Sequence, residues 1–298
     1  MMATARTAVP FSAGTQPPGF VPPPLACDCH MHVYDSAYPA VAGARLRPPD
    51  ASVDDYRLLQ RRLGTARTVV VTPSTYGTDN RSLLDALHRL GPQARGIAVI
   101  DGSESDAELQ RLHDAGVRGA RLNLSLGVSG SVDAIVPLSR RLADLGWHLQ
   151  LLMAPEVLAT LGNVLRQSPV PLVFDHFGRI QPGADAHRPA HLLLLQLLAE
   201  GRAWIKLSGG YIVSASGSVD DPGLHALARS YLDVAPDRVL WGSDWPHATA
   251  SAGLQPLPDD ARQLDHLARW AGDAAALAQI LVHNPQRLYD FPSAPTSH

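Results

Sequence analysis

Eight units, each with a strand-like and a helix-like segment, follow one another along the chain, and this alternation limits its possible folds more than any other feature. Each unit is a short apolar segment followed by a segment with helical periodicity. One apolar segment, Arg-Thr-Val-Val-Val-Thr at residues 67–72, is the β-branched run typical of a strand covered on both faces. We expect strands at residues 27–33, 67–72, 96–101, 117–123, 147–153, 170–176, 203–208 and 238–244. We expect helices at residues 54–63, 79–90, 104–115, 131–145, 155–166, 188–200, 222–234 and 259–271, with an extra one at 273–288.

Eight strand–helix units predict a single (β/α)8 (TIM) barrel. A doubly wound open sheet is the alternative, but it would need a Gly-x-Gly-x-x-Gly after its first strand, and this chain has none there. With 298 residues, of which 45% are hydrophobic, the chain can form one large core. We expect the barrel at residues 25–292, an extended N-terminal arm at 1–24, the extra C-terminal helix within the barrel domain, and a tail at 293–298.

Composition and charge exclude several classes of partner. The net charge is −3 and no basic run is present, so neither nucleic acid nor an anionic membrane is an expected partner. Residues 1–24 contain one arginine, several prolines and no continuous apolar core, unlike a secretory signal or a membrane span. Cys27 and Cys29 are too close along one strand for a normal disulfide and lack the second pair of a zinc ribbon. We expect free thiols in a reducing cytoplasm and a small-molecule substrate as partner, and a homo-oligomer remains open.

The first strand carries the clearest sign of a site. With a period of two, Asp28, His30 and His32 point to one side, and Cys27 and Cys29 to the other. Two neighbouring imidazoles are costly to bury without partners, so their arrangement indicates a functional site. The alternative is a pair of partly exposed histidines near a chain end.

Other polar residues fall at the carboxyl ends of the predicted strands, where barrel enzymes place their catalytic groups. They are Ser74, Arg121, Asn123, Asp175, His176, Lys206, Ser208 and Asp244. We expect His30, His32 and His176 to face Asp244 across one barrel mouth, and these four are the candidate catalytic residues. The alternative for the histidines is a hydrogen-bonded core cluster, and the alternative for Asp244 is a carboxylate that caps the next loop.

Cations near the mouth are candidate anchors for an acidic substrate. Arg121 is the best candidate, because a guanidinium inside a barrel mouth needs an anionic partner, and Arg179 is the second. A structural salt bridge is the alternative role for Arg121. Further candidates for substrate contact, with loop packing as their alternative, are Ser74, Tyr76, Asn123, Tyr211 and His247.

Three motifs resemble a known family. They are His-x-His at residues 30–32, Asp-His-Phe-Gly at 175–178 and Trp-Gly-Ser-Asp-Trp-Pro-His at 241–247, the last being the most specific. Together they resemble the amidohydrolase superfamily, and most closely the branch that contains 2-pyrone-4,6-dicarboxylate lactonase and galactarolactone isomerase. The likeness runs from about residue 25 to residue 290.

The resemblance implies hydrolysis of a cyclic ester. Lactone opening needs a water deprotonated near the carbonyl and donors for the developing oxyanion. Asp244 is placed to be the general base, and His30, His32 and His176 to polarise the carbonyl. The alternatives are isomerisation of a sugar lactone in the same pocket and a metal-dependent decarboxylation on the same scaffold.

We expect no cofactor, and one zinc or manganese ion is the alternative. His30, His32, His176 and Asp244 are enough in number to hold zinc. Metal-dependent members of the superfamily also have a histidine at the end of strand five, whereas His148 stands at the beginning of that strand here. The lactonase that the chain resembles implies catalysis without a metal.

The resemblance also implies fewer cations in this pocket. The lactonase has an arginine where this chain has Gly127, and another in the segment that reads Ser-Gly-Gly-Tyr at 208–211 here. We therefore expect a less anionic substrate, with one carboxylate instead of two.

Overall fold

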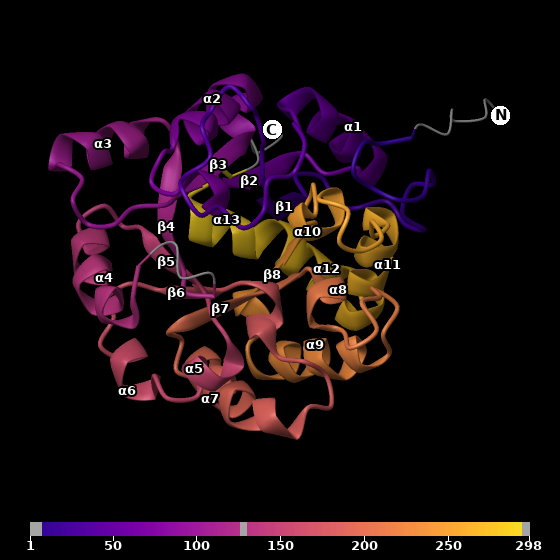
Figure 1. Cartoon of the computed structure of the whole chain (residues 1–298). Helices are drawn as coiled ribbons and strands as arrows, with labels where there is room; N and C mark the ends of the chain where they lie inside the picture. The colour runs from indigo at the N-terminus through magenta and orange to yellow at the C-terminus, as the bar shows by residue number, and fades with distance from the viewer. Residues whose placement is uncertain (1–7, 126–129, 294–298) are drawn as a thin grey trace.

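Eight parallel strands form one sheet, in which each strand lies beside its neighbours in the chain (Figure 1). The computed structural model describes residues 8–125 and 130–293. The strands are β1 (Cys27–Met31), β2 (Arg67–Val71), β3 (Ala94–Ala98), β4 (Val117–Asn123), β5 (His148–Leu152), β6 (Leu172–Phe174), β7 (Ala203–Ser208) and β8 (Val239–Gly242). Because all pairs are parallel, the carboxyl ends of the strands meet at one end of the sheet.

The first and last strands close the sheet into a barrel. The backbone N–H of Asp244, just after β8, donates to the carbonyl of His30, with a distance of 2.8 Å. The N–H of His32 donates to the carbonyl of Trp245, also over 2.8 Å. The predicted (β/α)8 barrel is confirmed, and its closure brings the histidines of β1 next to Asp244.

Helices surround the barrel (Figure 1). They are α1 (Val53–Leu63), α2 (Arg81–Leu90), α3 (Asp106–Asp114), α4 (Ile135–Ala143), α5 (Pro155–Leu158), α6 (Gly162–Leu165), α7 (Arg188–Ala199), α8 (Gly210–Val213), α9 (Gly223–Val234), α10 (Ala248–Ser251), α11 (Asp260–Ala271), α12 (Ala274–Ala278) and α13 (Asn284–Tyr289). The helix predicted at 155–166 is two short helices, and a π-helical turn (Gln279–His283) interrupts the last one. Pro285 has no N–H to donate to the carbonyl of the preceding helical turn, which explains why the regular helix is interrupted before it. None of the helices in the described ranges is long and apolar enough to span a bilayer.

A β-bulge in β1 changes which side chains face the barrel interior. The register with β2 shifts between Asp28 and Met31. Before the shift, Cys29 packs inside the barrel, while Asp28 points outward and accepts a hydrogen bond from Tyr56 of α1 over 3.0 Å. The prediction that Asp28 shares a face with the two histidines was therefore wrong. A bulge adds one residue and reverses the alternation after it, which turns both histidines inward.

Residues 8–24 contain no helix or strand and lie along the outside of the barrel (indigo in Figure 1). Arg62 of α1 donates from Nη1 to the carbonyl of Gly14 over 2.9 Å. The N–H of Gly19 donates to the carboxylate of Asp265 in α11 over 2.7 Å. The arm is thus attached to two neighbouring helices of the outer layer.

Candidate active site

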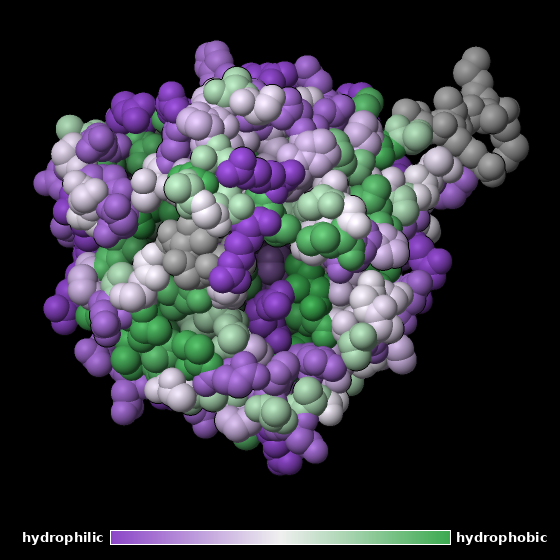
Figure 2. Space-filling view, viewed as in Figure 1, coloured by the Kyte–Doolittle hydropathy of each residue, from purple (hydrophilic) through white to green (hydrophobic). Residues whose placement is uncertain are grey.

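A cavity of about 260 Å³ opens at the carboxyl ends of the strands. Figure 2 shows the hollow near the middle of this face, between hydrophilic and hydrophobic side chains. The predicted site residues that line it are His32, Ser74, Arg121, Asn123, His176, Arg179 and Asp244. His30 lies directly beneath and is fully buried.

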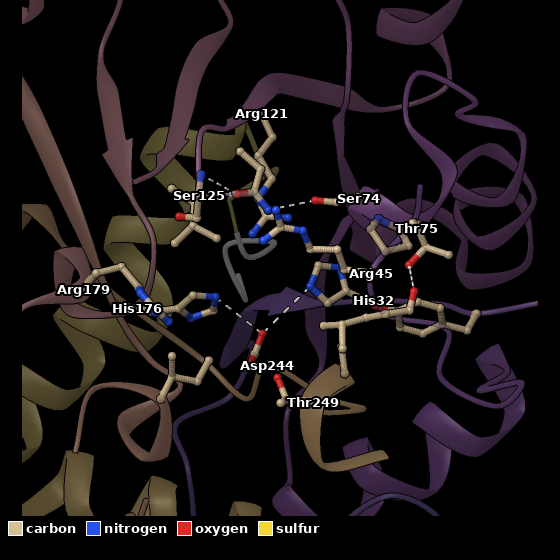
Figure 3. A pocket seen from close by; sticks show the side chains of 18 residues that line it. His32, Arg45, Ser74, Thr75, Arg121, Ser125, His176, Arg179, Asp244 and Thr249 are labelled. Atoms are coloured by element: carbon tan, nitrogen blue, oxygen red, sulfur yellow. Dashed lines mark hydrogen bonds and ion pairs between the residues drawn. The ribbon is translucent and has the colours of Figure 1, made fainter. Parts of the chain in front are cut away.

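The four candidate catalytic residues converge on one point, and Figure 3 shows three of them, His32, His176 and Asp244. The Nε2 atoms of His30, His32 and His176 lie 3.6, 3.8 and 3.7 Å from Oδ1 of Asp244. The other oxygen of Asp244, Oδ2, accepts a hydrogen bond from the Tyr211 hydroxyl over 2.6 Å. The carboxylate therefore has one oxygen held from behind and the other directed at the imidazoles.

Hydrogen bonds orient two of the three imidazoles. Nδ1 of His32 lies 2.7 Å from the carbonyl oxygen of Val71, so Nδ1 carries a proton and a neutral ring has a lone pair on Nε2. Nδ1 of His176 lies 3.0 Å from the hydroxyl of Ser208, which can donate or accept. Of these two rings, only His176 can therefore present an Nε2–H to the cavity while neutral.

His30 has two neighbours for its Nδ1 atom. Oδ1 of Asp175 lies 3.2 Å away and Nζ of Lys206 lies 3.4 Å away. A proton on Nδ1 faces Asp175, whose Oδ1 has no other hydrogen-bond partner within the described ranges. A proton on Nε2 instead lets Nδ1 accept from Lys206 and lets Nε2–H donate to Nε2 of His32, 3.3 Å away. The tautomer of His30 therefore decides whether its Nε2 atom presents a proton or a lone pair to Asp244 and His32.

Burial and charge together set the protonation of the centre. Burial, helped by the charge of Arg121, lowers the pKa of His32 to about 4. Burial also lowers the pKa of His30 and His176. Burial opposes ionisation of Asp244, but the positive charge that the surrounding imidazoles carry when protonated, His176 first, holds the pKa of Asp244 below the usual value. Near neutral pH the centre is thus a carboxylate facing three uncharged rings.

A buried ionic network forms the floor beneath the centre. Asp175 accepts from Nε of Arg121 and from the amide of Gln150, each over 3.0 Å. Lys206 donates from Nζ to Oε1 of Gln150 over 2.6 Å and lies 3.6 Å from Asp175. Arg121 therefore has the structural salt bridge of the alternative prediction, yet its guanidinium also lines the cavity.

Strand β5 contributes to the floor but not to the imidazole cluster. Gln150 was not predicted as a site residue, although its period-two spacing from His148 indicates that it faces inward. His148 lies at the opposite end of the barrel, as its position in the strand predicted, with its ring centroid 5.3 Å from that of Tyr289 in α13.

Three arginines border the cavity. Arg45, in the loop between β1 and α1, was not predicted, and it joins Arg121 of β4 and Arg179 after β6 (Figure 3). Arg179 has no ion pair within the described ranges, and the position of Gly127 lies outside those ranges. The cavity therefore has one cation more than the sequence analysis counted.

Several site residues have an unusual backbone. Five non-glycine residues near the centre have positive φ: His176 (49°), Phe177 (54°), Arg179 (62°), Asp244 (67°) and His247 (61°). This left-handed region is sterically unfavourable for residues other than glycine, asparagine and aspartate. The tight turns after β6 and β8 therefore direct the side chains into the mouth at a conformational cost.

Comparison with known proteins identifies the family. The family model described as Amidohydrolase matches residues 27–291, nearly the whole chain. The chain belongs to the amidohydrolase family. Its predicted resemblance to this family is thereby confirmed.

Characterised relatives of this amidohydrolase include enzymes that act on lactones. It is 36% identical to a 4-sulfomuconolactone hydrolase of Rhizobium radiobacter, over 93% of this chain and 94% of that protein. It is 35% identical to a 2-pyrone-4,6-dicarboxylate hydrolase of Comamonas testosteroni, with the same coverage of 93% and 94%. It is 30% identical to a D-galactarolactone isomerase of Agrobacterium fabrum, again over 93% and 94%. A crystal structure of an Agrobacterium tumefaciens protein superposes with a TM-score of 0.82 at 27% identity, covering 93% of this chain and all of that one.

The donor set of this amidohydrolase fits a divalent metal. His30, His32 and Asp244 offer ligand atoms that all lie within 4.8 Å of one another, and His30, Asp175 and His176 form a second such set. The Nε2 atoms of His30 and His32 are 3.3 Å apart, close to the roughly 3.3 Å between two ligands of one tetrahedral zinc ion. The lone pair of His32 already faces the centre, and His30 offers one when its Nδ1 proton faces Asp175.

Three predicted substrate contacts are placed elsewhere in this amidohydrolase. Tyr76, Tyr211 and His247 are buried, with exposures of 3%, 3% and 0%, and are not among the described residues that line the cavity. The hydroxyl of Tyr76 donates to the carbonyl of Asp35 and accepts from the N–H of Asp35, within the loop. Tyr211 and His247 lie behind Asp244 because the chain turns back after β7 and β8. Ser74 and Asn123 do line the cavity, and the amide of Asn123 donates to the hydroxyl of Ser74 over 2.8 Å.

Proposed function

We propose that this amidohydrolase hydrolyses a lactone that carries acidic groups, using Asp244 as the general base. The observation that carries the proposal is the carboxylate of Asp244 amid three imidazoles, at the floor of a cavity bordered by three arginines. The relatives named as hydrolases of 4-sulfomuconolactone and 2-pyrone-4,6-dicarboxylate support it.

Water activation falls to the free oxygen of Asp244. Oδ2 accepts from Tyr211, so Oδ1 remains for a water in the cavity. In a neutral His32, Nε2 has a lone pair that can accept from Nε2–H of His30, and it cannot donate to an oxyanion. The donors for the lactone carbonyl are then Nε2–H of His176 and the guanidinium of Arg121. This assigns carbonyl polarisation to fewer histidines than the sequence analysis did.

If a metal binds, His30, His32, His176 and Asp244 would hold it. A divalent ion at that point would supply Lewis acidity to the carbonyl and lower the pKa of a bound water. As a ligand, however, Asp244 would become less basic. Without an ion, the hydrogen bonds are mutually consistent when Lys206 donates to His30 and His30 donates to His32. We therefore propose catalysis without a metal.

Substrate binding falls to the arginines. Guanidinium groups bind carboxylates and sulfonates through paired N–H donors. Arg45, Arg121 and Arg179 come from three separate segments, so they can reach acidic groups at different points of one small ring. Because Arg45 adds a cation, we propose a substrate with more than one acidic group, in place of the single carboxylate expected from the sequence.

A panel of acidic and polyhydroxylated lactones, incubated in ¹⁸O-labelled water, tests the function. Hydrolysis places one ¹⁸O atom in the ring-opened acid, whereas isomerisation to another lactone consumes no water. The D-galactarolactone isomerase among the relatives makes isomerisation the second candidate. Unlabelled lactone products would favour the isomerase, and release of carbon dioxide would favour a decarboxylase.

A further inference from the structure

A chain of hydrogen bonds connects the N-terminal arm to Asp244. The Tyr211 hydroxyl donates to Oδ2 of Asp244 and lies 3.2 Å from Nδ1 of His247. Nε2 of His247 lies 3.1 Å from Oδ2 of Asp260, in the first turn of α11. The hydroxyl of Ser12, in the arm, donates to the same oxygen of Asp260 over 2.5 Å. The chain thus runs from the outside of the barrel to the carboxylate in the cavity.

Every member of this chain is buried. The exposed fractions are 8% for Ser12, 0% for Asp260, 0% for His247, 3% for Tyr211 and 5% for Asp244. Only Asp244 is among the described residues that line the cavity. A buried polar group without a partner is costly, so each member restricts the position of the next.

We propose that the N-terminal arm is a positioning element of the active site, in which Ser12, through Asp260, His247 and Tyr211, fixes the orientation of the Asp244 carboxylate. The inference rests on the proposed function only in so far as Asp244 is the reacting group. Oδ2 held by Tyr211 leaves Oδ1 directed at the imidazoles, and a rotated carboxylate would lose this alignment.

The arm is held firmly where Ser12 lies. Nη2 of Arg62 donates to the Ser12 hydroxyl over 2.6 Å, so this hydroxyl accepts one hydrogen bond and donates another. On the other side, the indole N–H of Trp245 donates to the carbonyl of Pro10 over 2.8 Å. The rings of Phe11 and Trp245 meet edge to face, with centroids 5.8 Å apart. Trp245 directly follows Asp244 in the sequence, so the arm also contacts the residue next to the far end of the chain of hydrogen bonds.

A double-mutant cycle with Ser12→Ala and Tyr211→Phe tests whether the two residues act through one another. Tyr211→Phe should lower kcat by about 10–100-fold, and Ser12→Ala by about 3–10-fold, with KM changed less than about 2-fold in each, because positioning affects the reacting geometry more than binding. The double variant should be no slower than Tyr211→Phe alone, because the connection is already broken. Ser12→Thr, which keeps the hydroxyl, should recover most of kcat.

Ser168→Ala is the matched control. Ser168 is also buried, and its hydroxyl donates to the carbonyl of Val170 over 2.8 Å, before β6 at the opposite end of the barrel. Its loss should lower the melting temperature without changing kcat. An unchanged kcat in Ser12→Ala, or equal effects of Ser12→Ala in the presence and absence of the Tyr211 hydroxyl, would overturn the proposal.

A second measurement does not depend on turnover. In the full chain, ¹⁵N NMR of the His247 ring reports its contacts with Asp260 and Tyr211. Ser12→Ala should shift the ring signals of His247, and Ser168→Ala should leave them in place. Unchanged signals in Ser12→Ala overturn the connection, whereas a wild type that opens no lactone overturns the proposed function alone.

Discussion

Replacing Asp244 by Asn removes the proposed base with little change of shape. The side-chain oxygen of Asn can still accept from the Tyr211 hydroxyl, which lies 2.6 Å from Oδ2. The amide then takes the place of Oδ1, where the three Nε2 atoms are 3.6–3.8 Å away. The cavity and its arginines are unchanged, so the variant isolates loss of the base.

The expected loss follows from the role of a single positioned base. We expect kcat to fall by about 10²–10⁴-fold, equivalent to about 2.7–5.4 kcal/mol in the activation barrier, with KM within about 3-fold of the wild type. The measurement is the initial rate of lactone opening against substrate concentration. Asp114→Asn, an exposed carboxylate at the end of α3, is the control and should leave both constants unchanged.

The pH dependence gives an independent check. A base must be ionised, so the wild-type rate should fall with decreasing pH as Asp244 gains a proton. Because the imidazoles hold the pKa of Asp244 below its usual value despite burial, this fall should begin below the usual range for aspartate. The Asn variant should lack it. An Asn variant with nearly normal turnover and the same acidic fall would refute the assignment and move the role of general base to a histidine.

Three further predictions address the metal, the anchors and the floor. Chelator-treated protein should keep most of its lactonase activity, and metal analysis should find well under one zinc per chain; a full equivalent, with activity lost to chelator and restored by zinc or manganese, would make the histidines ligands. Arg179→Ala should raise KM by about 10–100-fold for a lactone with two acidic groups and change it much less for a neutral lactone; an equal rise for both would argue against an anchoring role. Asp175→Asn should lower the free energy of unfolding by about 3–5 kcal/mol in denaturant titrations, since it leaves Arg121 and Lys206 buried without a counter-charge; a loss below about 1 kcal/mol would show that the two cations are compensated elsewhere.

The sequence predicted the barrel and the meeting of its central residues for one physical reason. In a closed parallel barrel all strands end at the same mouth, so polar residues at strand ends must meet there even when they are far apart in the chain. His30, His176 and Asp244 could therefore be brought together without any knowledge of their contacts. The elements themselves followed from apolar runs and helical periodicity.

Features that depend on backbone irregularity or long-range packing could not be predicted in this way. The bulge in β1 leaves no mark in the alternation of residues, so Asp28 was placed on the wrong face. Arg45 lies in a loop without helix or strand to fix its direction. Tyr211 and His247 follow strands as substrate-contacting residues do, but the turns carry them behind Asp244. The connection through Ser12 joins two ends of the chain that share no local pattern.

The left-handed residues around the mouth have a consequence for laboratory evolution. Glycine adopts this backbone without the steric cost of about 1 kcal/mol or more that other residues incur. A library selected for heat resistance alone should therefore accept glycine at Arg179, which is only partly buried, but not at Phe177, whose buried ring would leave a cavity. A library selected for turnover should reject glycine at Arg179. Variants that survive the thermal screen would be more stable but less active, so thermal stability and turnover have to be selected together.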